Sequence, residues 1–191
     1  MLCSALVLSA CAVRPMGRSY MLASVRHRTL TTKMQLTMSE LPVKDCSGQP
    51  VNLPSMASGK RVALYFTAGW CPMCRDFEPA LEKYRLAAEE SGNPVLCVMV
   101  SSDRSAADAG KRALDLKMLH VEYDGSVRDA LKAKYKVWAG VEQGKLGTGR
   151  RSGVPALVVI DEAGQELAFV DAERSGSKSL IKWPTDAGRW R

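Results

Sequence analysis

Two cysteines spaced three apart are the residues of this chain best suited to chemistry. Cys71 and Cys74 follow the apolar run 61–66 directly and precede a helical pattern. A strand that turns into a helix at its first cysteine offers that sulfur unpaired backbone N–H groups and the positive end of the helix dipole. Both favour the thiolate, which is the nucleophilic form. We therefore predict that Cys71 attacks disulfides and that Cys74, one turn further on, resolves the mixed disulfide.

A zinc site and a structural disulfide are the two alternatives for this pair. A structural zinc usually takes four ligands. The remaining cysteines and the histidines form no second close group: Cys3, Cys11, Cys46, Cys97, His27 and His120. A disulfide that closes so short a loop would constrain the unfolded chain little. Thiol–disulfide exchange, which needs neither a metal nor an organic cofactor, is therefore the favoured interpretation.

The positive charge of the chain is concentrated at its N-terminus. Residues 1–39 contain five basic residues and no acidic one, and the rest of the chain has 22 basic against 20 acidic residues. The overall charge of +7 thus gives no support to a nucleic-acid partner. An acid-free segment rich in Arg, Ser and Thr is typical of organelle transit peptides. We predict a disordered targeting leader over 1–38, directed to the mitochondrion, and a domain over 39–191.

Two other accounts of the N-terminus remain open. The apolar stretch 2–13 could be a secretory or lipoprotein signal, although no basic residue precedes it. Translation could instead start at Met34 or Met38, which would leave the protein in the cytoplasm. No stretch reaches the roughly 20 apolar residues of a membrane span, so we expect no stable membrane insertion.

Apolar runs and helical patterns alternate along the domain. The continuous runs 62–67, 95–100 and 154–160 predict buried strands, and 165–170 predicts a strand that pairs back on the third run. Pro72 suits the first turn of a helix that begins after Cys71. Further helix starts are expected at Ser105 and Ser126, and 53–59 reads as a turn-rich lead-in. The pattern predicts an α/β domain, a mixed sheet with helices on both faces, which we expect to be monomeric.

The segment around Cys71 and Cys74 resembles the corresponding segment of a known protein family. Residues 62–79 are similar to the WCPPCR-x-F-x-P segment of tryparedoxins and nucleoredoxins, and 95–105, 153–161 and Trp183-Pro184 resemble further stretches of these proteins in the same order. The resemblance covers about residues 39–185. It implies the thioredoxin fold and the reduction of disulfide-containing target proteins, with electrons from an upstream thiol or reductase.

The same resemblance implies a docking surface around Cys71. It assigns substrate binding to Trp70, Pro72, Val154 and Pro155. Pro155 is expected to follow a cis peptide bond, with the Val154 backbone turned toward Cys71 so that an extended target chain can pair with it.

The chain also departs from the family pattern. Met73 replaces the usual second proline, and Tyr65 occupies the position of the buried acid of thioredoxins proper, so the simplest internal proton acceptor is missing. The basic, Gly-rich segment 136–152 is longer than the family leads us to expect, and we predict a flexible surface loop that borders the active site. A membrane-tethered extracytoplasmic protein of the TlpA type, or a thioredoxin-fold binding module without redox turnover, remain as alternative functions.

Overall fold

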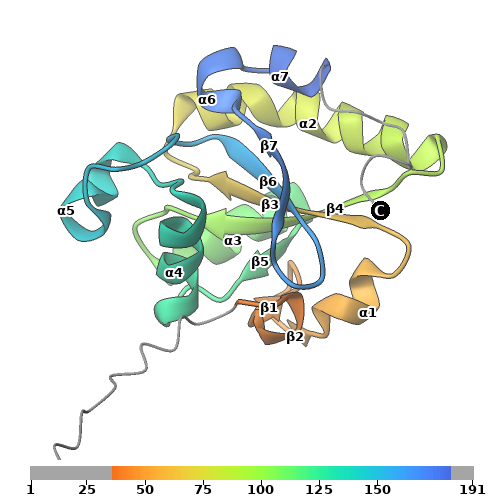
Figure 1. Cartoon of the computed structure of the whole chain (residues 1–191), viewed down its shortest axis with the longest axis horizontal. Helices are drawn as coiled ribbons and strands as arrows, with labels where there is room; N and C mark the ends of the chain where they lie inside the picture. Colours follow the sequence, from red (N-terminus) through yellow and green to blue (C-terminus); the bar gives the residue numbers. More distant parts are fainter. Residues whose placement is uncertain (1–35, 182–191) are drawn as a thin grey trace, which may run out of the picture. The chain divides into compact units, whose positions relative to one another are not determined.

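One mixed sheet forms the centre of the fold (Figure 1). The computed structural model describes residues 36–181. The sheet of this part has the strand order β2-β1-β5-β4-β3-β6-β7. Its strands are β1 (Val43–Lys44), β2 (Pro50–Val51), β3 (Arg61–Thr67), β4 (Val95–Ser101), β5 (Leu119–Val121), β6 (Ala156–Ile160) and β7 (Glu166–Val170).

The strand β3 lies between a parallel and an antiparallel neighbour. It pairs with β4 in parallel, so that Thr67 lies opposite Ser101, and with β6 antiparallel, so that Phe66 lies opposite Ala156. The ends of β3 and β4 and the start of β6 therefore meet at one edge of the sheet. The predicted candidate residues follow or precede the strands at this edge.

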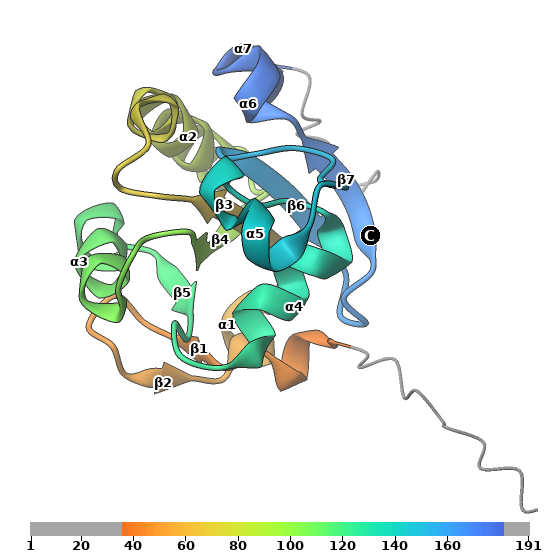
Figure 2. The same ribbon diagram turned by 90° about the vertical axis from the view of Figure 1, so that its left-hand side faces the viewer.

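Helices cover both faces of the sheet. They are α1 (Leu53–Ala57), α2 (Pro72–Glu90), α3 (Ala106–Leu116), α4 (Ser126–Tyr135), α5 (Gln143–Leu146), α6 (Ala172–Ser175) and α7 (Lys178–Ile181), with 3-10 turns η1 (Met38–Glu40) and η2 (Gly140–Glu142). Figure 2 shows α2 and α3 on one side of the sheet and α4 on the other. Alternate residues of β3 supply the two cores: Phe66 packs with Leu131 and Tyr135 of α4, and Tyr65 packs with Phe77 of α2.

This architecture confirms the predicted α/β class, with two local corrections. The lead-in 53–59 contains the helix α1, whose N-cap Asn52 accepts a hydrogen bond from Ser55 N at 2.9 Å. The helix α4 starts at Ser126 as expected, but its N-cap is Gly125, so the Ser126 side chain does not cap it. Ser105 caps α3 as predicted. Trp183-Pro184 lies outside the described residues, as do residues 1–35.

The packed domain includes residues assigned to the leader. Leu36 and Met38 are buried in the core that α1 and α4 share, and Met38 N donates to Glu162 O at 3.0 Å. The domain therefore begins before the predicted boundary at residue 39. Among the residues described, no helix combines the length and the apolar character needed to cross a membrane.

The segment 136–152 is also more structured than predicted. It contains η2 and α5, and it buries Val137, Trp138 and Ala139. Val137 forms a parallel bridge with Ser152, so both ends of the segment are tied together. The expectation of a surface loop is met for most of residues 140–151, which are largely exposed, whereas residues 137–139 are anchored in the core.

Candidate active site

The helix α2 begins directly after Cys71, as the sequence predicts. Cys71 is its N-cap, with extended backbone angles, and Pro72 is the first helical residue. Cys71 N donates to Ala68 O at 3.1 Å, which turns the chain from β3 into the helix. Pro72 and Met73 are exposed, whereas Cys71 keeps only 4% of its surface accessible. The first thiol thus lies at the start of a long helix, beneath two exposed residues.

Cys74 lies one turn further on and is fully buried. Burial raises the pKa of its thiol to about 12 and the neighbouring Cys71 adds to the rise, whereas the Thr67 hydroxyl and the Ala68 backbone oppose it. Cys74 is therefore held as a protonated thiol against Cys71 at neutral pH. It can become a nucleophile only after it loses its proton.

The segment that precedes β6 faces Cys71. The Val154–Pro155 peptide bond is cis, and Cys71 Sγ lies 3.6 Å from Val154 O. The Val154 backbone is thus turned toward the thiol, as the resemblance implied. Glu173 of α6 accepts a hydrogen bond from Gly153 N, and a Cβ at Gly153 would lie 2.2 Å from Glu173 Oε1. A glycine at this position allows the carboxylate to hold the segment closely.

Trp70 is fixed by the turn that ends β4. Its indole N–H donates to Ser102 O at 3.0 Å, and Gly69 N donates to Asp103 Oδ1 at 2.7 Å. Arg75, which the sequence could not place, donates to Gly69 O at 3.2 Å from the first turn of α2. These contacts hold the half-buried Trp70 beside the first thiol.

A buried polar cluster lies behind the second thiol. Glu78 accepts hydrogen bonds at 3.4 Å from Tyr65 Oη and at 3.5 Å from Thr67 Oγ1, and it forms an ion pair with Arg112 of α3. Burial raises the pKa of Glu78, while the Arg112 guanidinium and the two hydroxyls oppose this rise. Sequence reasoning missed this cluster, although Glu78 is four residues after Cys74 and therefore on the same helix face.

A second ion pair links α4 to the segment 136–152 and to the active site. Lys132, which is fully buried, pairs with Glu142. Glu142 also accepts from Ser102 Oγ at 2.7 Å and from Ala139 N at 3.0 Å. The segment therefore borders the active site, as predicted, through Ser102, whose carbonyl accepts the hydrogen bond from Trp70. No residue pattern around Lys132 predicts that this side chain points inward.

The basic residues of the segment are largely paired with carboxylates. Lys145 lies against Asp129, Arg150 against Glu173, and Arg151 against Glu166. The local positive field is thus weaker than the residue count suggests.

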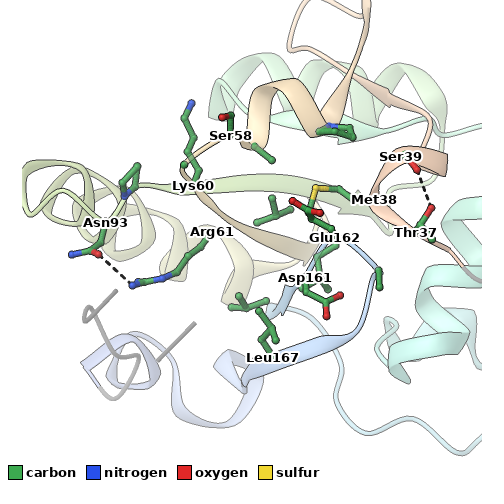
Figure 3. Close-up of a pocket in the computed structure, with 18 of the residues that line it drawn as sticks. Thr37, Met38, Ser39, Ser58, Lys60, Arg61, Asn93, Asp161, Glu162 and Leu167 are labelled. Atoms are coloured by element: carbon green, nitrogen blue, oxygen red, sulfur yellow. Dashed lines mark hydrogen bonds between the residues drawn. The ribbon is translucent and has the colours of Figure 1, made fainter. Parts of the chain in front are cut away.

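Two cavities differ in their relation to the thiols. A cavity of about 370 Å³ adjoins Trp70 and is lined by Gly69, Trp70, Asp103, Arg104, Asp108, Lys111, Arg112 and Asp115. A larger one, of about 1110 Å³, lies at the opposite edge of the sheet, where Figure 3 shows Lys60, Arg61, Asp161 and Glu162 around it. The larger cavity contains none of the candidate residues. Within 36–181, no group of three or more His, Cys, Asp or Glu side chains could hold a metal ion.

Comparison with known proteins shows which protein family the chain belongs to. A family model described as thioredoxin-like matches residues 59–166. Nucleoredoxin from Bos taurus is 30% identical over 66% of the chain, and the chain spans only 26% of that protein.

Solved structures of thioredoxin-like proteins are also similar to this chain. Tryparedoxin from Trypanosoma brucei is 26% identical with a TM-score of 0.57, over 78% of this chain and 90% of that one. Thioredoxin from Wuchereria bancrofti is 27% identical with a TM-score of 0.55, over 76% of this chain and 95% of that one. With the sheet and the thiol pair in place, these likenesses show that the chain belongs to the thioredoxin-like family and resembles its nucleoredoxins and tryparedoxins.

Proposed function

We propose that this protein reduces disulfides in other proteins through the Cys71–Cys74 dithiol. The observation that carries the proposal is the position of Cys71 at the start of α2, with Val154 O at 3.6 Å on one side and Cys74 behind it. The family is one of thiol–disulfide oxidoreductases, and a nucleophile at a helix start with a second thiol one turn away suits that chemistry.

The exchange takes place in two displacements. The Cys71 thiolate attacks one sulfur of the target disulfide, so that a Cys71–target S–S bond forms and the other target sulfur leaves as a thiolate. The Cys74 thiolate then attacks the Cys71 sulfur, and the second target sulfur leaves. Two electrons pass to the target, which becomes a dithiol, and Cys71 and Cys74 become a disulfide. An upstream thiol or reductase restores the dithiol.

The docking surface is formed by Trp70, Pro72, Val154 and Pro155. The indole of Trp70 is held by Ser102, and the backbone at Val154 faces Cys71. An extended target segment could pair with this backbone while its disulfide lies over the first thiol. The cavity beside Trp70 has side chains of both signs on its wall, which suits polar target segments better than purely apolar ones.

Serine variants of the two cysteines test the exchange. Cys71→Ser should abolish insulin reduction and form no mixed disulfide. Cys74→Ser should form a stable mixed disulfide with the target but should not turn over, because the resolving sulfur is missing. Wild-type protein that binds targets but reduces no insulin would instead indicate a binding module. Cys46→Ser, which changes a half-exposed thiol in a loop, is the matched control and should retain activity.

We also propose that the N-terminal leader directs the protein to the mitochondrion. The support is the charge pattern of residues 1–39, which contain basic residues and no acidic ones. Residues 1–40 fused to a fluorescent reporter should carry it into mitochondria, and Arg→Gln changes throughout the leader should prevent this. A cytoplasmic reporter would favour an internal start, and a secreted or envelope-bound one would favour an extracytoplasmic relative.

A further inference from the structure

The second displacement needs a base that can take a proton from Cys74. This thiol is fully buried, and burial raises its pKa to about 12. At neutral pH only a very small fraction of it is thiolate, and only the thiolate can attack the mixed disulfide. At the position where thioredoxins proper carry a buried acid, this chain has Tyr65 of β3, so that proton acceptor is missing.

The structure supplies a carboxylate from α2, the helix that carries Cys74, in place of an acid on β3. Glu78 lies one turn after Cys74 on α2, and only 10% of its side chain is accessible. Thr67 is fully buried, and its hydroxyl donates to Glu78 Oε1 at 3.5 Å. The same hydroxyl is near enough to the Cys74 sulfur to oppose the rise in the pKa of that thiol. A hydroxyl that accepts from a thiol and donates to a carboxylate can pass a proton between them.

The groups around Glu78 act on the pKa of its carboxyl group in opposite directions. Burial favours its protonated form, and the Arg112 guanidinium opposes this by favouring the carboxylate. Tyr65 donates to the same carboxylate oxygen at 3.4 Å and stays a neutral phenol, because burial raises its own pKa well above the ordinary value. The groups that face Glu78 are thus Tyr65 and Thr67 from β3 and Arg112 from α3, and Cys74 lies one turn before it on α2.

We propose that Glu78 accepts the Cys74 proton through the Thr67 hydroxyl during the resolving displacement. This inference rests on the proposed Cys71–Cys74 exchange. The S–H proton of Cys74 passes to Thr67 Oγ1 while the Thr67 hydroxyl proton passes to Glu78. The Cys74 thiolate then forms the bond to Cys71, and the target sulfur leaves with the electron pair of the broken S–S bond. Glu78 returns its proton to the departing thiolate or to water.

A small aromatic disulfide separates the two displacements. The probe is 5,5′-dithiobis(2-nitrobenzoic acid), mixed in a stopped-flow instrument with excess reduced full-length protein in which Cys3, Cys11 and Cys46 are serine. Attack by Cys71 releases one coloured thiolate, and resolution by Cys74 releases the second. Glu78→Gln should leave the first phase within about twofold of wild type. It should slow the second on the order of 10²-fold at pH 7, the usual scale of general base catalysis.

The pH profile distinguishes a proton acceptor from a structural carboxylate. In wild type the second phase should level off once Glu78 is ionised, whereas in Glu78→Gln it should rise about tenfold per pH unit, because Cys74 must ionise unaided. Arg112→Gln breaks the same ion pair but keeps the carboxylate, so it should only move the levelling-off to higher pH. Glu82→Gln, an exposed carboxylate on the same helix, is the matched control and should change neither phase.

Each alternative result has a definite meaning. An unchanged second phase in Glu78→Gln would overturn the inference, and so would equal slowing by Glu78→Gln and Arg112→Gln at every pH, because the ion pair alone would then matter. If Glu78→Gln does not fold, the pH profile of Arg112→Gln decides. A levelling-off at higher pH than in wild type supports the inference, and an unshifted one overturns it. No coloured product from wild type would instead overturn the proposed exchange itself.

Discussion

The two thiols of the site are one helical turn apart but lie in different surroundings. Cys71 is at the N-terminus of α2, where backbone N–H groups lack partners within the helix. Cys74 is enclosed by β3 and α2, and its neutral form is favoured by burial. In the proposed exchange, the first sulfur meets the target disulfide and the second must be activated only after the first has reacted.

The raised pKa of Cys74 predicts a loss of stability in alkali. The folded reduced protein holds this thiol with a pKa of about 12, against an ordinary value of 9.0. The unfolded chain therefore loses the Cys74 proton first as the pH rises. The stabilisation is complete below about pH 9 and is lost progressively between pH 9 and pH 12.

Cys74→Ser should thus reduce the slope of unfolding free energy against pH by about 1.4 kcal/mol per unit above pH 9. Urea unfolding of the reduced protein at pH 8, 9 and 10 measures this, with Cys46→Ser as the comparison. Buried Cys97, whose pKa burial raises to about 11, adds a slope of its own in both variants. Equal slopes in the two variants would show that Cys74 is not held as a neutral thiol.

Residue patterns in the sequence identified the two thiols but not the charged groups that lie near them. Cys71 and Cys74 are recognisable from their spacing and from the strand that precedes them. Glu78 could have been found from its position one turn after Cys74. Arg112 could not, because it is brought to Glu78 by the packing of α3 against α2, which no local pattern specifies. Long-range ion pairs depend on how the elements are arranged.

At the scale of elements, the segment 136–152 acts as a support for the active site. Lys132 in α4 and Glu142 in η2 form a buried ion pair, and Glu142 extends the contact to Ser102 at the end of β4. Burial lowers the pKa of Lys132, while the Glu142 carboxylate opposes this change. The Glu142 carboxylate therefore favours the charged form of the buried Lys132.

Breaking this pair should destabilise the protein strongly. Glu142→Gln leaves the fully buried Lys132 without its counter-charge, and we expect a loss of about 3–5 kcal/mol in unfolding free energy. Lys132→Met should also destabilise, and the double variant should lose less than the sum, since it leaves no buried charge unpaired.

The exposed pair of Lys145 and Asp129 provides the control. The Lys145 side chain is 66% accessible, so Lys145→Met should cost less than about 1 kcal/mol. Urea unfolding at neutral pH compares the variants. A cost for Glu142→Gln no larger than that of Lys145→Met would mean that the segment is only loosely held to α4.

At the scale of the whole molecule, the fold was the part most accessible to prediction. Continuous apolar runs identified β3, β4 and β6, because strands covered on both faces need apolar residues at every position. The short strands β1 and β2, of two residues each, carry no such run, and they depend on pairing with β5 and with each other. The boundary of the domain was misplaced because two buried residues, Leu36 and Met38, are too few to give a periodic signal.

That buried leucine distinguishes the two possible internal starts. Leu36 packs into the core with only 4% of its surface accessible, and its carbonyl accepts from Lys134 Nζ at 3.4 Å. Thr37 donates from its N–H and its hydroxyl to Glu40, at 3.0 and 2.8 Å, and so caps the first turn. A chain that begins at Met34 keeps all of these contacts, whereas one that begins at Met38 loses them.

We therefore expect protein that starts at Met34 to unfold at the same urea concentration as the full-length chain, and protein that starts at Met38 to be about 2–3 kcal/mol less stable. Burial of one leucine side chain accounts for most of this difference. Leu36→Ala in the full-length chain is the control for the side chain alone and should lose about 2 kcal/mol. If both truncated proteins were as stable as the full-length chain, the contacts of Leu36 and Thr37 would add nothing to the domain. If the expected difference is found, an internal start at Met34 would yield a complete domain and one at Met38 a weakened one.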